Sequence, residues 1–222
     1  MTSPHKDPAA SAAGKVLLVA GATGLVGGFV VSLALKNPSV VKVVAPTRRA
    51  LPPHPKLENP LVDFNALPAH ARWWQVDAVI CALGTTQRLA GSKEAFRRVD
   101  VEYPLAVARH AHAAGAGVFA LNSALGANAS ARSFYLRTKG EAEDAIRAVG
   151  FASLTIVRPG LIGGKREQFR LGERVAEVVL AILGPLVPRR YRTVPAERIA
   201  QALLNAALAA HPGRHVLESE AL

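Results

Sequence analysis

Three glycines spaced three residues apart form the first pattern in the chain that could bind a ligand. Gly21, Gly24 and Gly27 follow a short apolar stretch and open a helix-like segment. Gly21 would permit a tight turn, Gly24 would leave room for a pyrophosphate, and Gly27 would let a helix approach a strand closely. The free N–H groups and positive dipole end of that helix attract phosphates. The pattern favours a dinucleotide site over a plain glycine-rich turn. The other residues of the turn that we expect at the cofactor are Thr23, Leu25 and Val26.

Two arginines occupy the place where the ribose of such a cofactor is bound. About twenty residues beyond the glycines, an NAD site commonly has Asp or Glu, whose carboxylate binds the ribose 2′-hydroxyl. This chain has Arg48 and Arg49 there instead. Guanidinium groups pair with a 2′-phosphate in planar, bidentate geometry, whereas a carboxylate would repel it. The sequence therefore predicts NADP as cofactor, with NADPH preferred over NADH, unless the arginines are merely solvated.

A serine, a tyrosine and a lysine further along the chain could transfer protons. Tyr135 and Lys139 are four residues apart on a helix-like segment and so share a face, and Ser123 ends the strand-like segment before it. An ammonium near a phenol favours the phenolate, which makes Tyr135 a usable acid or base. Lys139 could also hold the nicotinamide ribose, and Ser123 could polarise and orient a substrate oxygen. The alternative is a surface Tyr–Lys pair that follows an unrelated serine.

These residues need an arrangement of strands and helices that brings them to one edge. Short apolar stretches predict strands at residues 15–20, 40–45, 61–64, 77–83, 117–122 and 153–157. Helices are expected at residues 25–35, 95–114, 131–149, 175–183 and 195–210. Parallel strands need crossovers of about a dozen residues or more, and helices supply them. The alternation predicts an α/β fold, a doubly wound parallel sheet (Rossmann-like) with helices on both faces.

The length of the chain, 222 residues, suits one domain with a small appendage. We expect a disordered N-terminal tail at residues 1–14 and an NAD(P)-binding Rossmann-like domain at residues 15–160. Residues 161–222 would form a small C-terminal substrate lid that is integrated with the same domain. We expect a small-molecule substrate, and the long helices leave a monomer and a homodimer both open.

Composition and charge narrow the class of protein. The net charge of +11 favours an anionic partner, but the charges are dispersed with no block of five, so we expect no nucleic acid. A single cysteine, Cys81, excludes an internal disulfide, and no cysteine or histidine cluster has metal-ligand spacing, so we predict no metal. No apolar run is long enough to span a bilayer, and no signal peptide is evident. We expect a cytoplasmic, bacterial protein.

Several longer motifs extend these patterns over nearly the whole chain. Besides the glycine turn, Arg48, Arg49 and Ser123, they are the runs Cys81-Ala-Leu-Gly84-Thr85-Thr86, Arg97-Arg-Val-Asp100, Tyr135-Leu-Arg-Thr-Lys139-Gly-Glu141 and Arg158-Pro159-Gly160. On these motifs the chain resembles the atypical or extended short-chain dehydrogenase/reductase superfamily. It is more specifically similar to the small Tat-interacting-protein-like subgroup.

The resemblance implies roles for further residues. Asp63 and Phe64 would face the adenine, and Leu83 and Gly84 would pass the adenosine ribose. Thr85 and Thr86 would follow the cofactor toward its pyrophosphate. The residues implied at the nicotinamide are Arg158, Pro159 and Gly160. Many short-chain reductases also use a helix asparagine, which has no evident counterpart near Asp100.

The function favoured by these patterns is that of an NADP-dependent oxidoreductase. It would move a hydride between the nicotinamide and a small carbonyl or alcohol, with Ser123, Tyr135 and Lys139 as catalytic residues. One alternative is an NAD(P)H-binding regulatory or redox-sensing protein with little catalysis. Another is an epimerase or dehydratase, although the C-terminal portion is short for a nucleotide-sugar pocket. A third is a membrane-surface or nucleic-acid binder that uses the basic residues of the lid, Lys165, Arg166, Arg170, Arg174, Arg189, Arg190 and Arg192.

Overall fold

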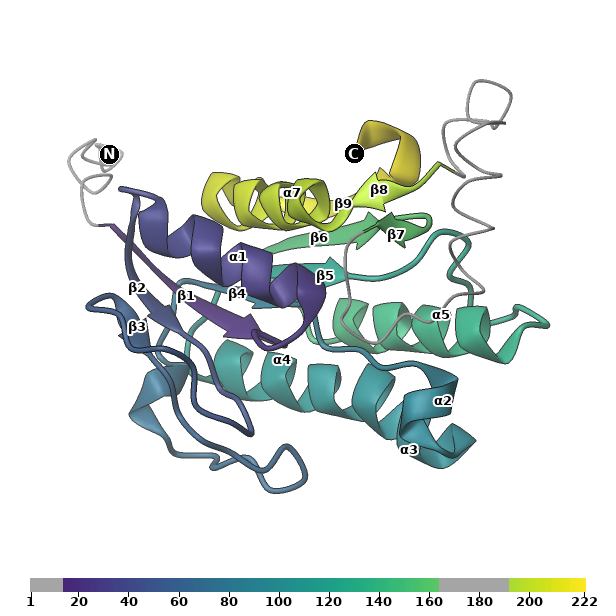
Figure 1. The fold of residues 1–222 in the computed structure, drawn as a ribbon, viewed down its shortest axis with the longest axis horizontal. Helices are drawn as coiled ribbons and strands as arrows, with labels where there is room; N and C mark the ends of the chain where they lie inside the picture. The colour runs from purple at the N-terminus through teal and green to yellow at the C-terminus, as the bar shows by residue number, and fades with distance from the viewer. Residues whose placement is uncertain (1–13, 164–191) are drawn as a thin grey trace, which may run out of the picture.

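Parallel strands in one sheet form the centre of the protein (Figure 1). The computed structural model describes residues 14–163 and 192–222. Within these residues the sheet has seven strands in the order β3-β2-β1-β4-β5-β6-β9, and every neighbouring pair is parallel. The strands are β1 (Lys15–Ala20), β2 (Val40–Val44), β3 (Leu57–Glu58), β4 (Ala78–Cys81), β5 (Val118–Asn122), β6 (Ser153–Arg158) and β9 (Gly213–Glu218). A small separate sheet pairs β7 (Ile162–Gly163) with β8 (Val194–Pro195).

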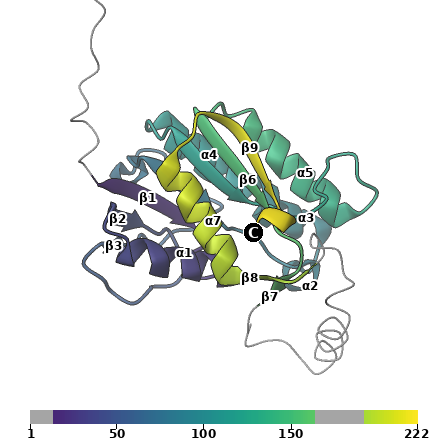
Figure 2. The ribbon, with the colours of Figure 1, turned by 90° about the horizontal axis from the view of Figure 1, so that it is seen from above.

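Helices cover both faces of the sheet, as Figures 1 and 2 show. The helices are α1 (Leu25–Lys36), α2 (Gln87–Ala90), α3 (Lys93–Arg97), α4 (Tyr103–Ala113), α5 (Phe134–Arg147) and α7 (Ala196–Ala209), and a π-helical segment (Arg98–Glu102) joins α3 to α4. Helices α1 and α7 pack on one face, and α4 and α5 pack on the other. The fold class predicted from the sequence is confirmed.

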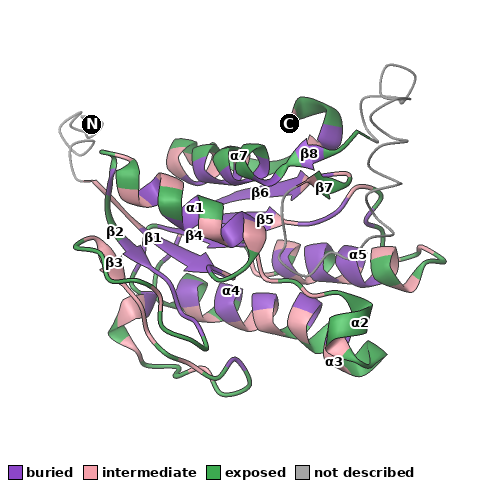
Figure 3. Cartoon of the chain, in the orientation of Figure 1, coloured by how far each residue is buried: buried purple, intermediate pink, exposed green. Residues whose placement is uncertain are grey.

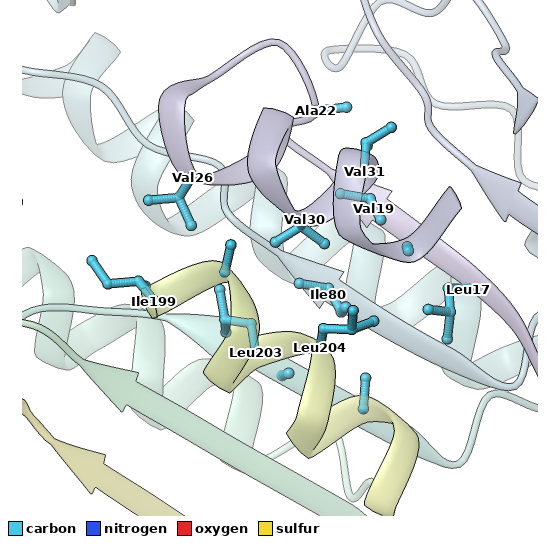
Figure 4. Close-up of a cluster of buried hydrophobic side chains, with 14 of the residues drawn as sticks. Leu17, Val19, Ala22, Val26, Val30, Val31, Ile80, Ile199, Leu203 and Leu204 are labelled. Atoms are coloured by element: carbon cyan, nitrogen blue, oxygen red, sulfur yellow. The ribbon is translucent and has the colours of Figure 1, made fainter. Parts of the chain in front are cut away.

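Burial follows from this layering. The strands of the sheet centre are almost fully buried (Figure 3), as expected where helices cover both faces of a parallel sheet. On the α1/α7 face, Val26 and Val30 meet Ile199 and Leu203 above the strand residue Ile80 (Figure 4). This core fixes the ends of β1 and β4, where the glycine turn and the loop after β4 begin.

One predicted strand is absent because a local side chain overrides the apolar pattern. Residues 61–64 are not a strand, since Asp63 accepts a hydrogen bond from the Asn65 N–H and closes a turn, and the short strand lies earlier, at β3. The helix predicted at 95–114 is present as three consecutive segments, α3, the π-helical segment and α4, and Pro104 lies in the first turn of α4.

The C-terminal part contributes directly to the sheet. Helix α7 packs against α1, and β9 pairs with β6 along its whole length. Strand β9 was missed because Arg214 and His215 interrupt its apolar pattern. The division at residue 160 into a domain and a lid stays a prediction. Residues 1–13 of the tail expected at 1–14 lie outside the described residues. So do the lid residues 164–191, with the helix expected at 175–183 and most of the basic cluster. In the part of the chain that the structure describes, no helix is long and apolar enough to span a membrane.

Candidate functional site

The glycine turn joins β1 to α1 and is packed too tightly for side chains. Gly21 has a φ of +91°, and the Gly24 N–H donates to the Gly21 carbonyl oxygen at 2.9 Å. A Cβ atom on Gly27 would lie 2.1 Å from that same carbonyl oxygen, so helix and turn touch through their backbones. Helix α1 starts at Leu25 with Gly24 as an N-cap that offers no side-chain acceptor. The first N–H groups of α1 are therefore left for a ligand.

The turn lies at the point where the strand order reverses. Strands β2 and β3 continue the sheet on one side of β1, and β4, β5 and β6 continue it on the other. Open α/β sheets bind ligands at the carboxyl ends of the strands at this place. A Cβ on Gly21 would lie 2.6 Å from the backbone of Ala82, which places the turn directly against the end of β4.

Arg48 and Arg49 follow β2 at the same end of the sheet, and both are exposed. The backbone beside them is fixed, because the Thr47 hydroxyl donates to the Arg49 carbonyl oxygen at 2.6 Å. The Asn59 amide in turn donates to the Thr47 hydroxyl oxygen at 2.8 Å. Within the described residues neither guanidinium group is engaged in an ion pair. The two arginines are thus placed on a fixed loop beside the glycine turn, with their charges open to an anion.

A buried ion pair holds Lys139. Its Nζ lies 2.6 Å from Asp100 Oδ1, and the two side chains are 10% and 0% exposed. The other oxygen of Asp100 accepts the Thr85 N–H at 2.9 Å, which ties the loop after β4 to the same carboxylate. Burial alone would lower the pKa of Lys139, but the charges of Asp100 and then of Tyr135 raise it above its ordinary value. Lys139 is therefore a protonated ammonium held in place beside Gly84.

Asp100 is the functional residue whose part in the site sequence reasoning missed. It lies in the π-helical segment, which places it under the loop after β4. The signal available in the sequence was a carboxylate next to the apolar Val101 inside a predicted helix. In the structure both residues are buried. Charged residues of this kind are rarely buried unless they are paired.

Tyr135 lies one turn before Lys139 on α5 and is 37% exposed. Its ring packs near Phe96 of α3, with the ring centroids 6.0 Å apart. Its position on α5 depends on Gly140, because a Cβ there would lie 2.1 Å from the backbone nitrogen of Ala129. Helix α5 thus rests against the 128–129 loop through the two backbones, and the tyrosine and lysine are brought together beside the strand ends.

Ser123 follows β5 and is 5% exposed, with its hydroxyl turned inward. The hydroxyl donates to Glu143 Oε1 at 2.6 Å, and the Ser123 N–H donates to the Val157 carbonyl oxygen at 2.8 Å. Burial opposes the ionisation of Glu143, but its hydrogen bonds with Arg158 and Ser123 hold its pKa below the ordinary value. An ionised carboxylate only accepts, so the hydrogen of Ser123 is committed to Glu143. The Ser123 oxygen can still accept a hydrogen bond.

Arg158 belongs to the same charged cluster. Its guanidinium donates to both oxygens of Glu143, with Nε 2.9 Å from Oε1, and Nη1 donates to Glu218 at 3.0 Å. Arg147 adds a further bond to Glu143 at 2.8 Å. The pKa of Arg158 is raised, first by its hydrogen bond to Glu143. The side chain of Arg158 is therefore occupied by two carboxylates. The Pro159 carbonyl oxygen accepts the Leu125 N–H at 2.8 Å, and the Gly160 N–H donates to the Ser219 hydroxyl oxygen at 3.1 Å. A role for these residues at the nicotinamide stays a prediction.

The remaining residues expected at the cofactor have structural partners of their own. Asp63 closes its turn, and Phe64 is buried with its ring centroid 5.6 Å from that of Tyr103. Leu83 packs partly into the core, and the Thr86 hydroxyl caps α2 by accepting the Leu89 N–H at 3.2 Å. Roles for these residues at the adenosine stay predictions. The part of the chain that the structure describes contains no group of three or more potential metal ligands.

Comparison with known proteins agrees with this geometry. Residues 21–208 match a family model described as NAD(P)H-binding. The chain is 34% identical to protein fmp52, mitochondrial, of Aspergillus clavatus over 208 residues, which cover 87% of each chain. It is 32% identical to protein HTATIP2 of Rattus norvegicus over 214 residues, which cover 94% of this chain and 88% of the relative.

These names correct one expectation drawn from the sequence. The prediction of a cytoplasmic protein is contradicted, because FMP52 proteins of several fungi, including Candida albicans, are named mitochondrial. Composition could not distinguish the two compartments, since a single buried cysteine suits both. A bacterial source has no support either, because these relatives are fungal and mammalian.

Solved structures show the same fold at low identity. MoeE5 in complex with UDP-glucose and NAD has a TM-score of 0.70 and 21% identity, over 92% of this chain and 75% of that chain. The Bordetella bronchiseptica enzyme WbmH in complex with NAD⁺ has a TM-score of 0.66 and 16% identity, over 90% and 74%. Together with the glycine turn, the family match and the relatives show that this chain belongs to the NAD(P)H-binding family, as a Rossmann-like protein related to FMP52 and HTATIP2.

Proposed function

We propose that the protein is an NADP-dependent oxidoreductase of the short-chain type that acts on a small carbonyl or alcohol. The observation that carries this proposal is the ammonium of Lys139, which forms a buried ion pair with Asp100. Lys139 lies on the same helix as Tyr135, which is partly exposed. This arrangement stands at the carboxyl ends of the strands, next to a turn that fits a dinucleotide.

The residues present fit the cofactor. In the glycine turn a Cβ on Gly27 would collide with the Gly21 carbonyl oxygen, so the close backbone packing of the turn needs glycine there. The first N–H groups of α1 remain open for a pyrophosphate. Arg48 and Arg49 stand exposed after β2, where they would pair with a 2′-phosphate. When bound, the dinucleotide supplies or accepts a hydride at its nicotinamide.

The residues of the chain account for the proton that must accompany the hydride. In the reductive direction Tyr135 donates its phenolic proton to the carbonyl oxygen, and in the oxidative direction its phenolate takes the proton from the alcohol. Lys139 stabilises the phenolate by its charge, and Asp100 keeps that charge in position. Ser123 acts as a hydrogen-bond acceptor that orients a hydroxyl, because its own hydrogen goes to Glu143. This refines the sequence-based proposal in which Ser123 polarises the substrate oxygen.

The test of the chemistry is the Tyr135→Phe variant in a screen of small aldehydes, ketones and alcohols for NADPH oxidation or NADP⁺ reduction. We expect turnover to vanish while the affinity for NADPH, measured by fluorescence titration, stays almost unchanged. Tyr103→Phe is the matched control, since the Tyr103 hydroxyl donates to Asn65 at 2.8 Å and is not one of the proposed proton-transfer residues. Turnover that persists in Tyr135→Phe would refute the proposed proton donor.

The cofactor preference has its own test. We expect NADPH to bind about tenfold or more tightly than NADH, a difference of about 1.4 kcal/mol or more. Replacing both Arg48 and Arg49 by Ser should remove the preference by weakening NADPH binding alone. Arg72→Ser, in a short helix elsewhere on the chain, is the control. Equal affinities in the wild-type protein would contradict the assignment.

Two other functions give different expected results in the same screen. The first is a cofactor-dependent regulator. It would bind NADPH, but no carbonyl compound in the screen would support NADPH oxidation, and it would bind a protein partner only with the cofactor bound. The second is an epimerase or dehydratase, since MoeE5, which has a similar fold, binds UDP-glucose or UDP-glucuronic acid together with NAD. Such an enzyme would act on a nucleotide sugar without net oxidation of the cofactor. The names of the fungal relatives support a mitochondrial location for this chain.

A further inference from the structure

Strand β9 leaves one side of the sheet open. It is the outermost strand beside β6 (Figure 2), and within the described residues nothing pairs with its other side. The Gly213 N–H donates to the Ala152 carbonyl oxygen, on the side of β6. Because backbone groups alternate sides along a strand, those of Arg214, Val216 and Glu218 face outward. The edge thus offers a regular row of donors and acceptors.

The two edges of the sheet differ in how they are guarded. At the opposite edge β3 has two residues, with Pro55 before it and Pro60 after it. Natural edges are blunted in this way by short strands and prolines. Strand β9 has six residues without a proline, and its central Val216 is 43% exposed. An unguarded edge of this length is a surface for adding a further strand.

The side chains of β9 are complementary to those of a second copy in one register. Arg214, Val216 and Glu218 alternate onto the same face of the strand. If two β9 strands run antiparallel about a twofold axis at Val216, each Arg214 stands opposite the partner's Glu218, and the two valines face each other. On the other face His215 stands opposite the partner's Leu217. Opposite charges across an antiparallel pair stabilise it. The outward backbone groups of Arg214 and the partner's Glu218, and of the two Val216 residues, would exchange both hydrogen bonds.

We propose that β9 is a homodimer interface, in which two copies pair antiparallel about Val216 and join their sheets into one. A twofold interface needs a patch that is complementary to itself, and the order Arg214, Val216, Glu218 is one. A partner of another sequence would not require this symmetry. The proposal is independent of the function proposed above.

The experiment reverses the charges one at a time and then combines the variants. We expect light scattering with size exclusion to give twice the 23.4 kDa chain mass for the wild-type protein. Arg214→Glu and Glu218→Arg should each be monomeric, because like charges then face each other. An equimolar mixture should dimerise again, since its two chains present opposite charges at both positions. Circular dichroism checks folding, since Glu218 also contacts Arg158.

The register is tested by cross-linking. Facing residues in such a pair have Cα atoms about 5.5 Å apart, within the range of a disulfide. Val216→Cys should therefore form a disulfide-linked dimer under a mild oxidant. Val41→Cys is the matched control and should stay unlinked, since this valine on β2 is 51% exposed, against 43% for Val216. The native Cys81 is fully buried and should not interfere.

Three outcomes would overturn the proposal. The first is a monomeric wild-type protein at micromolar concentration, and the second is a mixture of the two charge variants that remains monomeric. The third is a dimer that survives Arg214→Glu but is lost in Arg109→Glu. Arg109 lines a groove of about 270 Å³ between α4 and α5, so that result would assign the interface to those helices.

Discussion

Replacing Asp100 by Asn should destabilise the protein strongly and in a pH-dependent way. The two side chains of the pair are 0% and 10% exposed, and the substitution keeps an oxygen for the Thr85 N–H while it removes the charge. Lys139 is then left as a buried cation without its partner. Breaking a buried pair in this way costs about 3–5 kcal/mol in the free energy of unfolding. For a chain of this length that corresponds to a melting temperature lower by about 6–20 °C.

The pH dependence follows from the pKa of Lys139. In the wild-type protein this pKa is raised, so the stabilisation from the pair is fully present below the ordinary lysine pKa and is lost as pH rises through the folded value. In Asp100→Asn, burial dominates and lowers the pKa of Lys139. The unfolded chain then binds the extra proton, so the stability of the variant rises with pH. The difference between variant and wild type should therefore be largest near neutral pH and should shrink in alkali.

Urea unfolding followed by the fluorescence of Trp73 and Trp74, at neutral and at alkaline pH, measures these free energies. The double variant Asp100→Asn with Lys139→Met removes the stranded charge and should recover much of the loss. Glu58→Gln is the control, because its pair with Lys42 is 40–47% exposed and should contribute about 0–1 kcal/mol. If Asp100→Asn costs no more than this surface pair, or if its cost does not vary with pH, the description of a buried, charged pair is wrong.

Three further predictions concern other parts of the site. Gly27→Ala should weaken NADPH binding by about tenfold or more, equivalent to about 1.4 kcal/mol, because its Cβ would lie 2.1 Å from the Gly21 carbonyl oxygen. Gly28→Ala is the control and should bind NADPH normally in the same titration, since its Cβ would lie 3.6 Å from the Ala22 carbonyl oxygen. Burial raises the pKa of Cys81 to about 12, so a maleimide should label the thiol only after denaturation, and rapid labelling of the native protein would contradict its burial. The lowered pKa of Glu143 means that its stabilisation is present above the ordinary glutamate pKa and is lost as pH falls through the folded value. Glu143→Gln should therefore be less stable at neutral pH and show a shallower loss of stability in acid, as measured by urea unfolding across that range.

Much of the fold could be predicted because parallel strands are buried on both faces and so stand out as apolar runs. Strands β1, β4, β5 and β6 follow this rule, and the glycine turn indicates the end of the sheet at which we propose that the cofactor binds. Strand β9 does not follow it, because an edge strand is half covered and carries polar residues such as Arg214 and His215. The turn at Asp63 was predicted as a strand because its neighbours are apolar, and the sequence pattern does not reveal the hydrogen bond from the Asn65 N–H to the Asp63 carboxylate.

The sequence predicted which residues form the candidate site, but not which side chains pair with Lys139 and Ser123. Spacing on a helix placed Tyr135 and Lys139 on one face, and the strand end placed Ser123 near them. Spacing gives no information on contacts between distant segments, and these determine what each group can do. Asp100 forms an ion pair with Lys139 from a different helical segment, and Glu143, one turn beyond Lys139, accepts the hydrogen of Ser123.

The glycine that follows Lys139 has a consequence for how this site can change. At Gly140, α5 meets the 128–129 loop through main-chain atoms, so at this point the closeness of the two segments is limited by the backbone itself. The height of the phenol and the ammonium above the strand ends is therefore a property of the backbone, and exchanging packing residues cannot adjust it. Any residue larger than glycine at position 140 would require the segment after β5 to take another course. A chain with the tyrosine and lysine but without this glycine should therefore carry the two groups to a different place.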